Sequence, residues 1–176
     1  MKDECLKIMS CVAKRKLEGV MVHDALADAF LVMNLYGFSE FHRKRENAEF
    51  KEFHKVKDYI IERHGEIPST EGATIEDTSI LYFHKKYSRE NLTPETKRKI
   101  CAYIFEYIVD WETETIEFLS AKYKELVAHG AIAESIYVAN MIEDTDKELK
   151  GFIRCHIRYE DTNYDMVQIT DDQDDD

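Results

Sequence analysis

The stretch "EFKEFHKVKDYIIERHGEIP", residues 49–68, predicts an amphipathic helix that stops at Gly65 and Pro68. Its apolar face is formed by residues at helical spacing: Phe50, Phe53, Val56, Ile60 and Ile61. Two carboxylates, Glu49 and Glu52, stand one helical turn apart, inside this face or at its edge. A carboxylate beside an apolar core costs free energy unless it is protonated or meets a cation. The stretch therefore predicts a long helix and a charged site near the core.

Composition favours long helices in one domain. The chain has 176 residues, enough for a sizeable core, with only two prolines and six glycines to break regular structure. The net charge of −12 argues against a nucleic-acid surface, which needs clustered Lys and Arg, and is compatible with attracting cations. Part of that charge lies in the final "DDQDDD", which we interpret as a solvated tail.

Several absent signals indicate a cytoplasmic protein. The first residues, "MKDECLKIMSCVAKRK", lack the apolar stretch and cleavage site of a signal peptide. No apolar run reaches the ~18 residues that a membrane helix needs. The four cysteines are scattered without CxxC spacing, which favours reduced thiols.

The spacing of apolar residues predicts four long helices and a bundle. We expect them at residues 3–34, 38–64, 94–128 and 131–160, with a short helix at 75–87. The first and last connections are short, so each joins an antiparallel pair, whereas the middle one is long. We therefore predict an all-α four-helix bundle over residues 1–162, with a long crossover between its second and third helices, followed by an acidic tail at 163–176.

On helical wheels, further acidic residues fall on the sides of the helices that are predicted to face the core. Glu112 falls within the apolar arc of the third helix. Glu143 and Asp146 fall within or beside the arc of the fourth helix, which we expect to bury Ile132, Ile136, Ala139, Ile142, Leu149, Ile153 and Ile157. Five acids at one level repel unless a cation lies among them, and iron, manganese or zinc accepts carboxylate oxygen. The alternative is that these acids are solvated residues at the edges of the arcs.

Histidines contribute little to this pattern. His23 points inward and is expected to be a core residue. The others lack paired spacing and are expected at the surface: His42, His54, His64, His84, His129 and His156.

Residues 37–68, "GFSEFHRKRENAEFKEFHKVKDYIIERHGEIP", resemble the second helix of the non-haem ferritins, within the ferritin-like superfamily. In that register Glu49 matches the family's bridging glutamate, and Glu52 takes the place of its histidine ligand. Glu112 in "WETETIEFL" is similar to a third glutamate, while Glu143 and Asp146 match the remaining polar positions. The resemblance spans roughly residues 5–160.

The resemblance implies a function. It implies a ferroxidase that binds two Fe²⁺ ions in the bundle and oxidises them with O₂ or H₂O₂, storing the iron within a homo-oligomer. Its metal ligands would be Glu49, Glu52, Glu112, Glu143, Asp146 and, on the first helix, Glu18.

One departure keeps a second interpretation open. An ungapped count back from Gly37 puts Lys16, not Glu18, at the position of the family's first-helix glutamate. A Lys16–Glu49 pair, with Lys147 beside other acids, would replace the metal and leave a catalytically silent shell or assembly protein. Ferritin light chains resemble that arrangement. A third interpretation is a plain helical module that binds a partner, with all these acids at its rim.

Overall fold

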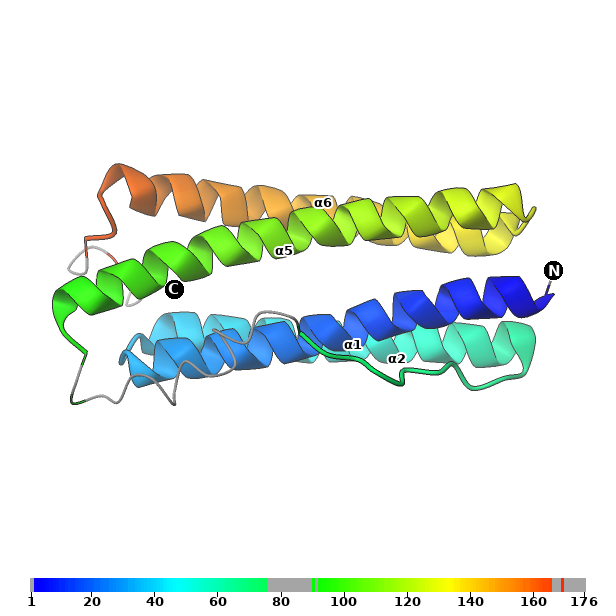
Figure 1. Cartoon of the computed structure of the whole chain (residues 1–176), viewed down its shortest axis with the longest axis horizontal. Coiled ribbons are helices and arrows are strands. Elements are labelled where there is room, and N and C mark those ends of the chain that lie inside the picture. The colour runs from blue at the N-terminus through cyan, green and yellow to red at the C-terminus, as the bar shows by residue number, and fades with distance from the viewer. Residues whose placement is uncertain (1, 76–89, 91, 166–168, 170–176) are drawn as a thin grey trace.

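The computed structural model describes residues 2–75, 90, 92–165 and 169, and it confirms the all-α four-helix bundle. The helices are α1 (Lys2–Val32), α2 (Tyr36–His64), α5 (Pro94–Ala128) and α6 (Ile132–Asp161). They form two long hairpins, α1 with α2 and α5 with α6, which lie side by side (Figure 1). The short helix expected at 75–87 and most of the acidic tail lie outside the described residues.

Local signals begin and end these helices. Thr93 precedes α5, and its hydroxyl accepts a hydrogen bond from the Thr96 N–H at 3.2 Å, with Pro94 in the first turn. Gly65 ends α2 in the left-handed conformation, with φ +73°, and its N–H donates to the Ile61 carbonyl at 2.8 Å. Both boundaries agree with the sequence-based prediction.

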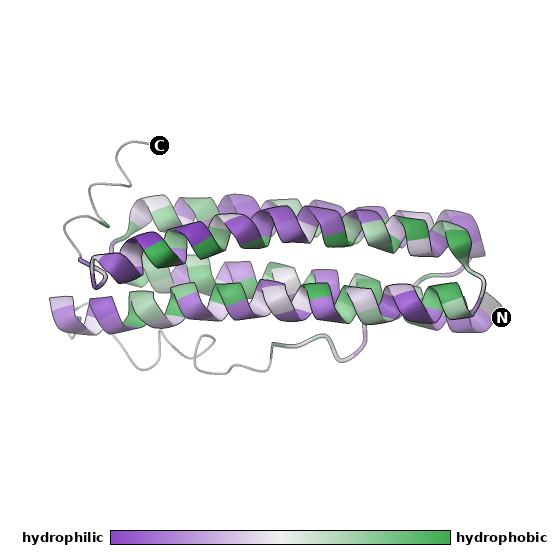
Figure 2. Ribbon diagram, turned by 90° about the horizontal axis from the view of Figure 1, so that it is seen from above, coloured by the Kyte–Doolittle hydropathy of each residue, from purple (hydrophilic) through white to green (hydrophobic). Residues whose placement is uncertain are grey.

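The crossover makes α2 and α5 parallel. Residues late in α2 and α5 share one buried cluster with residues early in α1 and α6, as Phe53, Leu119, Met9 and Val138 show. The described part of the connection that follows α2, residues 66–75, runs back beside α1 (Figure 1), as the parallel arrangement of α2 and α5 requires. Hydrophobic and hydrophilic residues are interspersed along every helix (Figure 2), as in helices that bury one side.

The buried core consists of two hydrophobic clusters with a polar layer between them. One cluster surrounds Phe30 and Phe105, and the other surrounds Met9 and Leu119. Side chains that lie between these clusters along the helices are polar although buried: Lys16, His23, His42, Glu49, Glu112, Thr115 and Thr145. This layer is where a site would lie.

Helix α6 presents a different face to the core from the one predicted. Four of its seven expected core residues are exposed, by 36–59%: Ile132, Ile136, Ile153 and Ile157. Ile142 is partly buried and packs against the core. The buried hydrophobic face instead carries Val138, Met141, Phe152 and Tyr159. Most isoleucines of α6 do not mark its buried face, because apolar residues occur on more than one side of this helix.

Two smaller expectations about burial were also wrong. Phe50 and Ile61 are 46% and 40% exposed, so they lie at the edge of the apolar face of α2. His42 and His64, expected at the surface, are buried. None of the described helices has a long enough apolar stretch to cross a membrane.

Candidate functional site

The centre of the polar layer is an ion pair between Lys16 of α1 and Glu49 of α2. The Lys16 Nζ lies 3.2 Å from Oε2 and 3.4 Å from Oε1 of Glu49, and the two side chains are only 10% and 8% exposed. Burial alone would lower the pKa of Lys16, but the charges of Glu49 and Glu148 raise it above its usual value. Lys16 is therefore a charged ammonium inside the bundle.

Helix α1 lies close to Glu49 of α2 because Gly19 of α1 has no side chain. A Cβ at Gly19 would lie 3.1 Å from Oε2 of Glu49. The glycine is therefore part of the site, since it leaves the space that the carboxylate of Glu49 occupies.

Arg45 brings a second cation to Glu49. It lies one turn before Glu49 on α2, and its Nη2 is 3.6 Å from Oε1 of Glu49. The same Nη2 forms a close ion pair with Glu148 of α6. Arg45 thus links the α1–α2 hairpin to α6, and Glu49 receives positive charge from two residues.

Glu112 of α5 completes the layer as a protonated acid. It is 4% exposed, and burial together with the negative charges of Glu49 and Glu148 raises its pKa to about 8. At pH 7 this carboxyl group is mostly neutral. The central charges therefore balance, because Lys16 and Arg45 offset Glu49 and Glu148.

The structure brings together only two of the six acids predicted as metal ligands. Glu49 and Glu112 are buried in the layer. Glu52 pairs with Lys55 at the surface, and Glu18 lies at the far side of α1 beside Lys14, with 4.0 Å between Nζ and Oε1.

The two acids on α6 point away from the layer, so their expected inward placement was wrong. Glu143 is 70% exposed as a side chain and pairs with Lys147 at 3.0 Å, while Asp146 pairs with Lys150. Relative to buried Met141, a helix places Glu143 about 200° around the axis and Glu148 about 20° away from it. The rotation of α6 therefore selects Glu148 as the acid that faces inward.

Sequence reasoning missed Arg45 and Glu148. Arg45 lies one turn from Glu49, and that spacing was a usable signal for an ion pair. Glu148 had no such signal, because its position depends on the rotation of α6. Lys147, expected in the network, instead pairs at the surface with Glu143 and Asp144.

The carboxylate groups of the polar layer are not arranged so as to bind two iron ions. The oxygens of Glu49 face an ammonium and a guanidinium, which already supply the positive charge that a metal ion would bring. In the part of the chain that the structure describes, no three His, Cys, Asp or Glu side chains are grouped so as to hold a metal. The metal-ligand role of the six acids stays a prediction.

A histidine pair borders the charged layer. The Nδ1 atoms of His23 and His42 are 2.9 Å apart, so one ring donates its proton to the other. The rings contact Phe152 of α6 and Phe30 of α1. Burial lowers the pKa of His42 to about 3, helped by Arg45, and burial, His42, Arg45 and Lys16 lower that of His23. Both rings are neutral at pH 7.

The fold is that of a ferritin-like four-helix bundle. Among solved structures the chain is similar to an open-pore ferritin from the hyperthermophilic archaeon Archaeoglobus fulgidus, with a TM-score of 0.78. The similarity covers 99% of this chain and 97% of that chain, at 11% sequence identity, and it therefore concerns the fold. No protein-family model and no curated protein sequence matches the chain.

Proposed function

We propose that this protein is a catalytically silent ferritin-like subunit, in which a charge network takes the place of a ferroxidase centre. The observation that carries the proposal is the buried Lys16–Glu49 pair, 3.2 Å long, with Arg45 on the same carboxylate. The ammonium supplies the positive charge that otherwise requires a metal. A buried pair of this kind contributes little net stability relative to apolar packing, so its role is to hold α1 and α2 in register without binding a metal.

The proposed role of the subunit is to build or assist a ferritin-like shell. The support is the likeness in fold to a protein described as an open-pore ferritin, over nearly the whole of both chains. In such an assembly, a silent subunit contributes wall and surface while other subunits oxidise iron.

Two measurements test the proposal. Fe²⁺ is added aerobically to the purified protein and its rate of oxidation is followed, and light scattering measures the mass of the protein assembly. We expect iron to oxidise at the rate seen in buffer alone, while a ferritin with a working centre accelerates it. We also expect a mass of several times 20.7 kDa. Rapid oxidation that Glu49→Gln abolishes would overturn the silent site. A monomer would contradict the shell and favour a helical module that binds a partner.

A second candidate is the ferroxidase function inferred from sequence. Its support is that two predicted ligands, Glu49 and Glu112, are buried in one layer of the bundle. Iron would be the substrate and O₂ or H₂O₂ the oxidant, and manganese or zinc would suit the same oxygen donors. For this function Lys16 would have to leave Glu49. The substitution Lys16→Glu tests that requirement, since faster iron oxidation in the variant would identify Lys16 as the block.

A further inference from the structure

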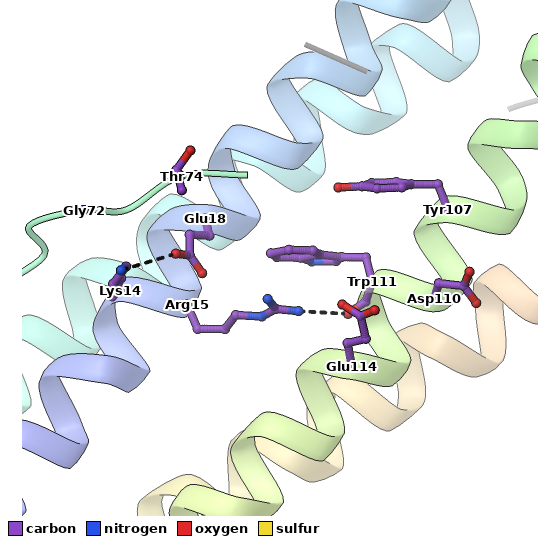
Figure 3. Close-up of a pocket in the computed structure, with 9 residues that line it drawn as sticks. All are labelled: Lys14, Arg15, Glu18, Gly72, Thr74, Tyr107, Asp110, Trp111 and Glu114. Carbon is purple, nitrogen blue, oxygen red and sulfur yellow. Dashed lines mark hydrogen bonds and ion pairs between the residues drawn. The ribbon is translucent and has the colours of Figure 1, made fainter. Parts of the chain in front are cut away.

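A pocket outside the charged layer lies between α1, α5 and the segment that follows α2. Its volume is about 420 Å³, within the range of roughly 300–1,000 Å³ found for small-molecule sites. Trp111 and Tyr107 of α5 line one side, and Gly72 and Thr74 line another (Figure 3). The pocket is formed by residues that the proposed function does not use.

Trp111 is largely buried, with 9% of the residue exposed, and Arg15 covers one face of its indole ring. The guanidinium carbon of Arg15 lies 3.5 Å from the ring centroid. Arg15 also donates to the Thr115 hydroxyl at 3.0 and 2.8 Å and to the Trp111 carbonyl at 3.3 Å. Figure 3 shows Tyr107 on the side of the indole opposite Arg15, and both aromatic residues line the pocket there.

The charges around the pocket favour a cation as its ligand. Three carboxylates line it, those of Glu18, Asp110 and Glu114, against two cations. Both cations have partners already, because Arg15 is bound to α5 and Lys14 lies 4.0 Å from Glu18. Among the ion pairs of the described residues none includes Asp110 or Glu114, although the charge of Glu114 also acts on Arg15. These two carboxylates supply the negative charge on this side of the pocket.

We propose that this pocket binds a small organic cation of the alkylated ammonium class. A quaternary ammonium is weakly hydrated and gains from the face of an indole, while nearby carboxylates supply the opposite charge. A metal ion fits less well, because it needs several oxygens converging at about 2.0–2.6 Å. This inference stands apart from the proposed silent site, since it uses the outer side of α1 and α5.

The experiment titrates the full chain with choline and follows the fluorescence of Trp111, the one tryptophan in the sequence. The neutral analogue 3,3-dimethyl-1-butanol has the same shape without the charge and is titrated in parallel. We expect a saturable change with choline at roughly millimolar concentration and binding of the analogue weaker by roughly tenfold. Saturation-transfer NMR on the choline methyl protons gives a second readout that does not depend on fluorescence.

A pair of variants tests the carboxylates. Asp110→Asn with Glu114→Gln should weaken choline binding by roughly fivefold or more. Glu106→Gln with Glu117→Gln removes the same charge from exposed positions of α5 outside the pocket and should leave binding unchanged. All four positions are exposed, and circular dichroism checks that the variants fold. Absence of binding by both readouts, equal binding of the neutral analogue, or equal loss in both variants would overturn the proposal.

Discussion

Lys16 and Glu49 form a buried ion pair, with 3.2 Å between Nζ and Oε2, at the level where the hydrophobic core is interrupted. The pair joins the two helices of the first hairpin, and Arg45 extends it to Glu148 on α6. Four of the central charges therefore form one network, and removing any one of them leaves the others with an unbalanced charge.

Replacing one partner of the Lys16–Glu49 pair should lower the free energy of unfolding far more than replacing both partners. Lys16→Met leaves Glu49 buried with less positive charge, and we expect a loss of roughly 3–5 kcal/mol in unfolding free energy. The double variant Lys16→Met with Glu49→Met should recover most of that loss, because no charge is then left unpaired. Urea unfolding at pH 7 measures both. Lys147→Met, which removes an exposed lysine, is the control and should leave stability unchanged. Independent, additive losses at Lys16 and Glu49 would contradict the pairing.

Gly19 of α1 and Gly151 of α6 should respond oppositely to substitution by alanine. Gly151→Ala in α6 meets nothing within 4 Å and should stabilise the protein by about 0.5–1 kcal/mol. Gly19→Ala puts a Cβ 3.1 Å from Oε2 of Glu49, whose carboxylate is held by Lys16. We therefore expect a loss of roughly 1–2 kcal/mol. Thermal or urea unfolding of the two variants decides this, and stabilisation by both would show that Glu49 moves freely.

Glu112 should make stability fall as the pH rises. Its pKa is about 8 in the folded protein and near 4.5 in the unfolded chain. Between these values the unfolded chain releases a proton that the folded protein keeps, so stability declines by up to about 1.4 kcal/mol per pH unit. Glu112→Gln has no proton to lose, and its advantage over the natural protein should grow from pH 5 to pH 8. Urea unfolding across this range tests the slope, with exposed Glu117→Gln as control. A constant difference would contradict a protonated Glu112.

The buried pair of His23 and His42 should make the stability of the fold decrease as the pH falls. The folded pKa of His42 is about 3 and that of His23 is also lowered, whereas unfolded histidine titrates near 6.5. The unfolded chain therefore binds protons first as the pH falls below about 6.5, and each histidine removes up to about 1.4 kcal/mol per pH unit. The neighbouring cations Lys16 and Arg45 oppose protonation further.

A double substitution isolates this acid effect. His23→Leu with His42→Phe removes both titrating rings, and we expect its stability to fall less between pH 6.5 and pH 4.5 than that of the natural protein. His54→Gln, at an exposed position of α2, should behave like the natural protein. Parallel curves for the double variant and the natural protein would exclude the buried pair as the acid-sensitive element.

Much of the fold was predictable from residues that act locally. The cap at Thr93, the stop at Gly65 and the apolar spacing predicted helices at 38–64 and 94–128, against Tyr36–His64 and Pro94–Ala128 in the structure. The lengths of the connections predicted the antiparallel pairs and the crossover. The pair of Lys16 and Glu49 was one of three interpretations that the sequence left open.

The sequence by itself determined four amphipathic helices, their order and the burial of Glu49 and Glu112, because caps and periodicity act within a few turns of one helix. Only the tertiary structure decided which other charges join them. Arg45 and Glu148 meet inside while Glu143 lies outside, because the rotation of α6 is set by its packing against the other helices. No periodicity within α6 could specify that rotation, since apolar side chains occupy both its inner and its outer faces.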